Sequence, residues 1–142
     1  MANLLTNIGE EYVAENDISG ATVKATVYND ATDSLSDTST LSDITTEPTG
    51  SSYARQSTTV TTKQIGGDFG FDSDAKLTFD VSDSSATVDH GALIVSFQSD
   101  TVAGDSSATD HLIAVDALTQ SRDLSQIDDL VFSAGELGFT LD

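Results

Sequence analysis

The spacing of apolar residues changes at residue 21 from that of a helix to that of a strand, and this change restricts the fold more than any other feature. From there on, apolar and polar residues alternate in short segments, which is typical of half-buried β-strands. Residues 75–81 are the clearest case, because Leu77, Phe79 and Val81 share one face. Residues 91–97 are apolar on both faces, as expected for a central strand.

Turn residues separate these segments and set the expected architecture. We expect strands over residues 21–28, 53–65, 75–81, 91–97, 111–118 and 129–132, and a closing hairpin in which residues 133–136 lead into residues 137–141. Seven or eight such strands predict an all-β fold, an antiparallel β-sandwich of the jelly-roll-like kind. With 142 residues, the chain is expected to form a single domain over residues 1–142.

Two segments do not follow the strand pattern. Near the start, five apolar residues fall on one side of a helix over residues 3–15, so residues 1–17 are expected to form a short N-terminal helix: Leu4, Leu5, Ile8, Tyr12 and Val13. Residues 29–52 are dense in Asp, Ser and Thr, and we expect a long acidic surface loop there with at most one short edge strand.

Charge and composition exclude several classes of protein. The chain has 5 Lys+Arg against 24 Asp+Glu, a net charge of −19, so free nucleic acid and anionic membrane surfaces are poor partners. It contains no Cys, which excludes disulfides, thiolate metal sites and thiol nucleophiles. No apolar run is long enough for a membrane span, and the start lacks a basic signal region, so we expect synthesis in the cytoplasm.

The acids are spread singly between apolar residues, which indicates a folded domain instead of a disordered tail. At ordinary ionic strength so many unbalanced charges destabilise a compact state, but the screening length falls to roughly 3 Å at 1 M salt. We therefore interpret the composition as adaptation to a high-salt environment. The alternative is an acidic protein that functions at ordinary salt.

No catalytic motif stands out, and we expect no enzyme. His90 and His111 lie beside Asp89 and Asp110, but Ser and Asp are so abundant that a Ser-His-Asp arrangement is expected by chance. The G-x-S-x-G elbow is absent, and a glycosidase carboxylate pair would lack a Trp to stack on a sugar. Each histidine is expected to be a hydrogen-bonded strand residue.

Two acidic clusters are candidate metal sites. Asp72 and Asp74 in one segment, and Asp30 and Asp33 in another, offer hard oxygen ligands for Ca²⁺ or Mg²⁺, although neither segment matches an EF-hand loop. A hydrated acidic surface that attracts K⁺ or Na⁺ explains the same clusters. No specific metal and no cofactor are therefore expected.

Three local patterns resemble a known family. They are residues 46–56 (TEPTGSSYARQ), residues 79–81 with 88–94 (FDV and VDHGALI), and residues 129–141 (DLVFSAGELGFTL). Together they resemble small structural proteins of tailed viruses, of the capsid decoration or tail-fibre-like kind. The Asp content and the absence of Trp favour a haloarchaeal virus version.

The resemblance implies a virion structural protein on the capsid surface, a decoration or cement protein of the tower or turret kind. Its partners would be the major capsid protein and other virion proteins, and it would form a homo-oligomer, with a trimer favoured and a pentamer possible in a capsid lattice. A tail or tail-fibre component is the first alternative. A secreted or surface carbohydrate-binding module of a halophile is the second.

Four residues of the first pattern are structural or interface candidates: Glu47, Tyr53, Arg55 and Gln56. Arg55 is one of five cations, and its guanidinium suits a bidentate pair with Glu47 or with an acid on a neighbouring subunit. We favour the intramolecular pair, which would lock the acidic loop onto the sheet.

Overall fold

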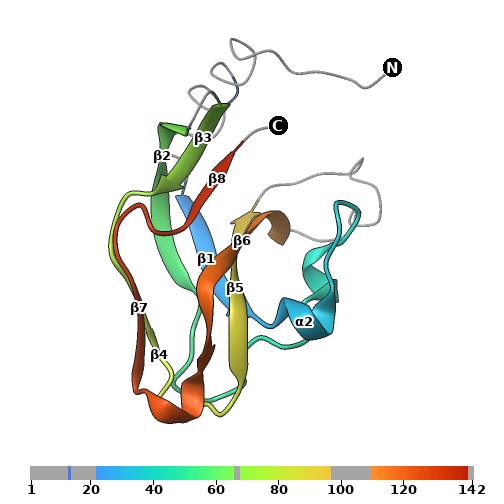
Figure 1. Ribbon diagram of the computed structural model, residues 1–142, viewed down its shortest axis with the longest axis vertical. Helices are drawn as coiled ribbons and strands as arrows, with labels where there is room; N and C mark the ends of the chain where they lie inside the picture. The colour runs from blue at the N-terminus through green and yellow to red at the C-terminus, as the bar shows by residue number, and fades with distance from the viewer. Residues whose placement is uncertain (1–12, 14–21, 66–67, 97–109, 141–142) are drawn as a thin grey trace.

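The strands form a curled antiparallel sheet with a small second sheet. The structure is a computed structural model that describes residue 13 and residues 22–65, 68–96 and 110–140. Its strands are β1 (Thr22–Tyr28), β2 (Gln56–Ile65), β3 (Asp68–Ser73), β4 (Leu77–Asp80), β5 (Thr87–Ser96), β6 (Asp110–Asp123), β7 (Asp129–Phe132) and β8 (Gly138–Thr140). The six-stranded sheet has the order β6-β5-β1-β2-β3-β8, and β4 pairs with β7 (Figure 1). The all-β, antiparallel prediction is confirmed.

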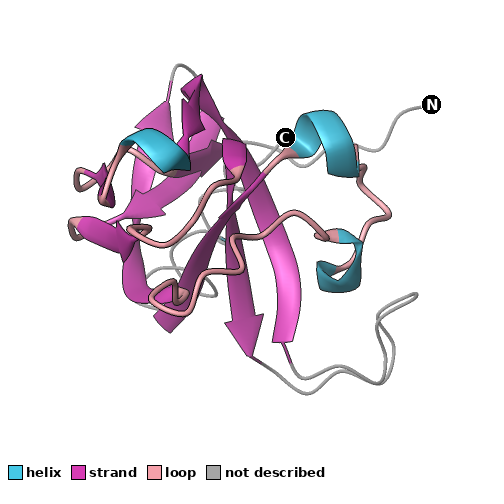
Figure 2. Ribbon diagram, turned by 90° about the horizontal axis from the view of Figure 1, so that it is seen from below, coloured by secondary structure: helices cyan, strands magenta, loops and turns pink. Residues whose placement is uncertain are grey.

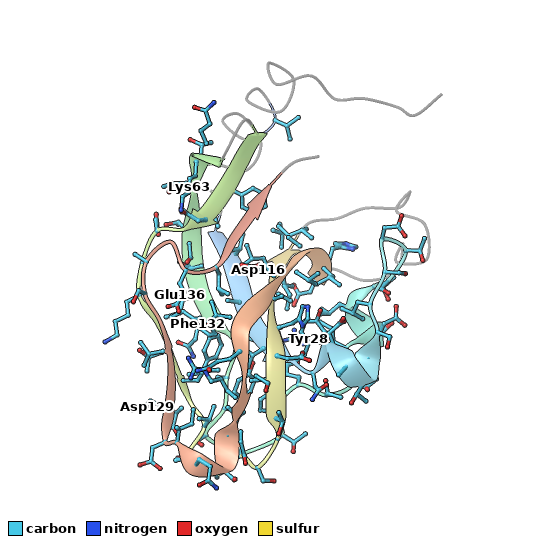
Figure 3. The ribbon with its side chains drawn as sticks, in the orientation of Figure 1. Tyr28, Lys63, Asp116, Asp129, Phe132 and Glu136 are labelled. Carbon is cyan, nitrogen blue, oxygen red and sulfur yellow. The ribbon has the colours of Figure 1, made fainter. Side chains whose placement is uncertain are left out.

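The alternating pattern places one face of each strand in the core. In β1, Val23, Ala25 and Val27 are fully buried, as their spacing predicts. The core is completed by Val60, Phe71, Leu77, Phe79, Val81, Val88, Leu93, Leu124, Leu130, Phe132 and Leu137. Phe79 lies edge-on to Phe132, with ring centres 6.0 Å apart. Phe132 lies between the β4–β7 pair and the large sheet (Figure 3).

The large sheet curls until its two outer strands approach each other. The backbone N–H of Gly138, in β8, donates to a carboxylate oxygen of Asp116, in β6, at 3.2 Å. Viewed from below, the strands surround a common interior and the helical turns lie at the periphery (Figure 2).

The expected closing hairpin is wrong. β7 pairs with β4 and β8 pairs with β3, so the chain keeps its direction through residues 133–137 instead of reversing. The kink depends on Gly135, whose φ of 80° suits glycine, and whose N–H donates to the Ser73 carbonyl. Ser73 N–H in turn donates to the Leu137 carbonyl, which continues the pairing across the kink.

The acidic segment after β1 lies outside the sheet and contains no strand. It forms a one-turn helix, α2 (Asp30–Asp33), and a 3₁₀ turn, η2 (Leu41–Asp43). The side chain of Asn29 caps α2 by accepting a hydrogen bond from Thr32 N–H. Asp, Ser and Thr side chains compete for backbone donors in this way, which explains why the segment forms turns and not the short edge strand allowed by the sequence.

Other differences are local. The expected N-terminal helix over residues 3–15 lies outside the described residues except for Val13. β6 continues past residue 118 to Asp123. Its last two residues, Arg122 and Asp123, are exposed, but they pair with Val88 and Thr87 of β5. A third turn, η3 (Leu124–Gln126), joins β6 to β7. In the part of the chain that the structure describes, no helix has the length and apolarity needed to cross a bilayer.

Candidate functional site

Residues 47–55 fasten the acidic segment to the sheet, and we call them the clamp. At its centre, the Arg55 guanidinium donates from Nε to Oε1 of Glu47 and from Nη2 to Oε2, both at 2.8 Å. This is the bidentate geometry that makes arginine–carboxylate pairs strong and directional. The pair expected from sequence therefore forms within the chain.

The clamp is joined to β1 by a directed hydrogen-bond chain. The Thr26 hydroxyl donates to Oε1 of Glu47, so the Tyr53 hydroxyl, 2.7 Å from Thr26 Oγ1, must donate to Thr26. Val27 N–H donates to the Tyr53 oxygen at 3.2 Å. The Tyr53 ring stacks on Phe79, with ring centres 5.7 Å apart, so one side chain links the polar clamp to the core.

The surroundings fix the protonation of Glu47 and Tyr53 in the clamp. Burial alone would raise the pKa of the Glu47 carboxyl, but hydrogen bonds from Arg55 and Thr26 outweigh it and hold this pKa below its usual range. Burial raises the pKa of Tyr53 to about 12. Glu47 is therefore charged and Tyr53 neutral across the physiological pH range.

The middle of the clamp contacts the connection between β4 and β5. The Asp83 carboxylate accepts hydrogen bonds from the Ser51 hydroxyl at 2.8 Å and from Ser52 N–H at 3.1 Å. These serine donors lower the pKa of Asp83 to about 2. Gly50 is required at this contact, because a Cβ there would overlap Asp83 and come within 2.9 Å of Ser84 Oγ.

Neutral donors also satisfy carboxylates in the acidic segment and in the strand beside it. Asp33 accepts from both the N–H and the hydroxyl of Thr45 and of Thr46. Burial opposes ionisation of Asp33, but these donors prevail and lower its pKa. Asp89 likewise accepts from two backbone N–H groups of α2. With only five cations, the chain orders its acids largely with hydroxyls and amides.

A polar cleft of about 480 Å³ lies between the acidic segment and the β4–β5 connection. It is lined by Asn29, Thr32, Thr45, Thr46, Glu47, Thr49, Gly50, Asp83, Ser84, Ser85, Ala86 and Thr87. No cation and no aromatic ring is among these residues. The cleft therefore offers hydroxyl groups and carboxylates, which suit a polyhydroxy or cationic ligand and oppose an anionic one.

The two candidate metal pairs do not assemble a metal site in the described residues, where no group of three or more carboxylates or imidazoles is arranged to hold an ion. Asp72 is nearly buried and pairs with Lys63 at 3.1 Å. Asp74 accepts a hydrogen bond from the Thr59 hydroxyl. Asp30 accepts from Leu35 N–H at 2.9 Å, and the oxygens of Asp33 are occupied by its threonine donors.

Each of the two histidines lies within a strand of the large sheet. His90 in β5 has its Nδ1 2.9 Å from the neighbouring Asp89 carboxylate, and its ring lies 5.6 Å from that of Tyr28. His111 in β6 is buried. His90 is thus a hydrogen-bonded strand residue, as expected.

Two residues that bind the clamp, Thr26 and Asp83, carry no sequence signal. Thr26 belongs to the polar face of the alternating β1 pattern, yet it is fully buried because the clamp covers that face. Asp83 is one acid in a turn rich in Asp and Ser. Gln56 was expected to belong to the site. Its side-chain amide donates a hydrogen bond to the nearby Ala54 carbonyl at 2.9 Å.

The fold and site define an all-β protein with antiparallel sheets in which a long acidic segment is clamped to the outside. Comparison of the chain with protein-family models, with curated proteins and with solved structures gives no match.

Proposed function

We propose that this chain is a virion structural protein, a capsid decoration protein on the head of a haloarchaeal tailed virus, that works by contact and converts no substrate. The observation that carries the proposal is the clamp. Glu47, Tyr53 and Arg55 direct their polar groups at one another and at β1, so these motif residues serve to hold a surface segment in a fixed shape. A rigid outer shape is what a protein that acts by docking requires.

The resemblance of the three sequence patterns supports the virion part of the proposal, and the charge of −19 supports the high-salt setting. The major capsid protein would be the main partner, and the chain would reach the capsid surface after synthesis in the host cytoplasm. A jelly-roll-like sandwich is our proposed description of the fold, with the β4–β7 pair as the beginning of a second layer.

The test is the location of the protein in purified particles. Virus is purified in molar salt, heads and tails are separated, and each fraction is examined by mass spectrometry and by immunogold labelling with antibody to this chain. We expect the protein on intact heads in many copies. Recovery with tails alone would favour the tail or tail-fibre alternative, and absence from particles would overturn the virion assignment.

The polar cleft favours a second candidate, a carbohydrate-binding module. Its volume of about 480 Å³ falls within the range of small-ligand sites, roughly 300–1,000 Å³, and its lining is rich in hydroxyls. Calorimetric titration with neutral and acidic oligosaccharides would test this function. Saturable binding that Thr87→Val weakens would support it, whereas no heat with any oligosaccharide would count against it.

A further inference from the structure

The first half of β6 presents an aliphatic surface, which we call the β6 strip: Leu112, Ile113, Ala114 and Val115. Ile113 is 40 % exposed and Val115 is 42 % exposed. The strip forms one wall of a groove of about 230 Å³, and residues Leu35, Ser36, Asp37 and Ser39 of the acidic segment form the other. This volume is below the usual range for small-molecule sites, roughly 300–1,000 Å³, and suits protruding side chains of a protein surface.

A backbone irregularity lies at Ile113, whose side chain is exposed. Leu112 lies opposite Ile94 and Ala114 lies opposite Leu93, so the ladder between β5 and β6 skips Ile113. Extra residues of this kind re-aim a side chain and are common next to functional surfaces. β6 is also an outer strand of its sheet, and outer strands are the ones through which sheets associate.

The strip is a place where this acidic chain can approach a copy of itself with little repulsion. None of its residues is charged, and Asp110 at one end pairs with Lys24 at 3.3 Å. Asp116, at the other end, accepts a hydrogen bond from the neutral Gly138 N–H. Among the described residues that line the groove, Asp37 is the one that carries a charge. In a chain of charge −19, this uncharged strip is a surface where two copies meet with less repulsion than at the acid-rich surface around it.

We infer that the β6 strip is the contact surface between two copies of this chain related by a two-fold axis. Ile113 and Val115 of each copy pack into the groove of the other. The arrangement is self-complementary because the same patch is used twice. A ring would need a second matching surface, but the other outer strand, β8, lies beside β6 of its own chain. The inference does not depend on the virion assignment.

The experiment measures the mass of the full chain in molar KCl by sedimentation over a range of concentrations. We expect a dimer that dissociates on dilution. The variants Ile113→Ser and Val115→Ser should raise its dissociation constant by roughly tenfold or more, as loss of a central apolar contact does. Val131→Ser is the matched control, because Val131 is an equally exposed strand residue, 43 %, outside the strip. It should leave the dimer unchanged.

A second measurement keeps the test independent of variant folding. Because the chain has no Cys, Ile113→Cys provides a single thiol per molecule, and a short bis-maleimide should join two chains, whereas Val131→Cys should stay uncoupled. A monomeric wild-type chain, a trimer or pentamer, or equal effects of the strip and control substitutions would overturn the inference.

Discussion

At the residue scale, the chain orders its carboxylates with neutral donors. Asp33 and Asp83 each collect hydrogen bonds from serine or threonine hydroxyls and from backbone N–H groups. Such bonds to a charged group are stronger than those between neutral groups. The one strong ion pair of the clamp, between Glu47 and Arg55, is placed where the acidic segment meets the sheet.

Replacing Glu47 by Gln should lower the free energy of unfolding by about 1–3 kcal/mol, because it leaves a partly buried guanidinium without its carboxylate. Chemical denaturation in molar KCl measures the change. Lys24→Gln is the control, since it breaks an exposed ion pair with Asp110 that is worth about 0–1 kcal/mol. Equal losses in the two variants would contradict the role assigned to the clamp.

Acid should destabilise the protein through the same carboxylates. The pKa of Asp83 is about 2 in the folded state, below its usual value near 4 in an unfolded chain. A depressed pKa contributes stability above pH 4, and this contribution is lost as the pH falls from about 4 to 2. The lowered pKa values of Glu47 and Asp33 act in the same direction.

The measurement is the free energy of unfolding between pH 6 and about 2 at constant KCl concentration. Asp83→Asn should flatten part of the decline, because the substituted side chain no longer takes up a proton. A wild-type curve that does not fall below pH 4, or a variant that declines as steeply as the wild type, would show that Asp83 does not contribute.

At the element scale, the contact between the clamp and the β4–β5 connection depends on Gly50, which has no side chain. Gly50→Ala should destabilise the fold by about 1–3 kcal/mol, because the added methyl group overlaps the Asp83 side chain and displaces it from its serine donors. Gly138→Ala is the matched control, since its Cβ would meet Asp72 Cβ at an ordinary 3.5 Å. Thermal melting compares the two variants, and equal melting temperatures would refute the close contact.

The strand pattern was predictable because alternation reports burial directly. β1, β4 and β7 were found where apolar and polar residues alternate. Strand partners were not predictable, because the Gly135 turn looks the same in sequence whether the chain reverses or continues. The length of β6 also escaped prediction, since its polar second half is held by pairing with β5 and not by burial.

The site was predictable in part. The Glu47–Arg55 pair could be predicted because the chain has few cations. The burial of Thr26 could not, because the clamp covers it and the alternation of apolar and polar residues does not show which segment covers a polar face. The candidate metal ligands were chosen because their spacing in sequence suits a metal site. In the structure, Asp33 accepts hydrogen bonds from nearby threonines and Asp72 forms an ion pair with Lys63. In a chain so rich in acids, spacing alone carries little information about ligation.

At the scale of the whole molecule, the charge of −19 should make stability depend on salt. Diluting KCl from molar to millimolar concentration lengthens the screening distance roughly tenfold or more and should lower the melting temperature or loosen the fold. Circular dichroism measures the change. Unchanged melting in dilute KCl would contradict the electrostatic explanation.

The pairing of β3 with β8 joins segments that are far apart in sequence, with Gly70 opposite Thr140. The large sheet therefore cannot be completed during synthesis until residues 138–140 have left the ribosome. Proteins dominated by such distant pairings fold in milliseconds to seconds instead of microseconds. Until then the incomplete sheet exposes aliphatic residues, so newly made chains face a period of aggregation risk in which chaperones would be most useful.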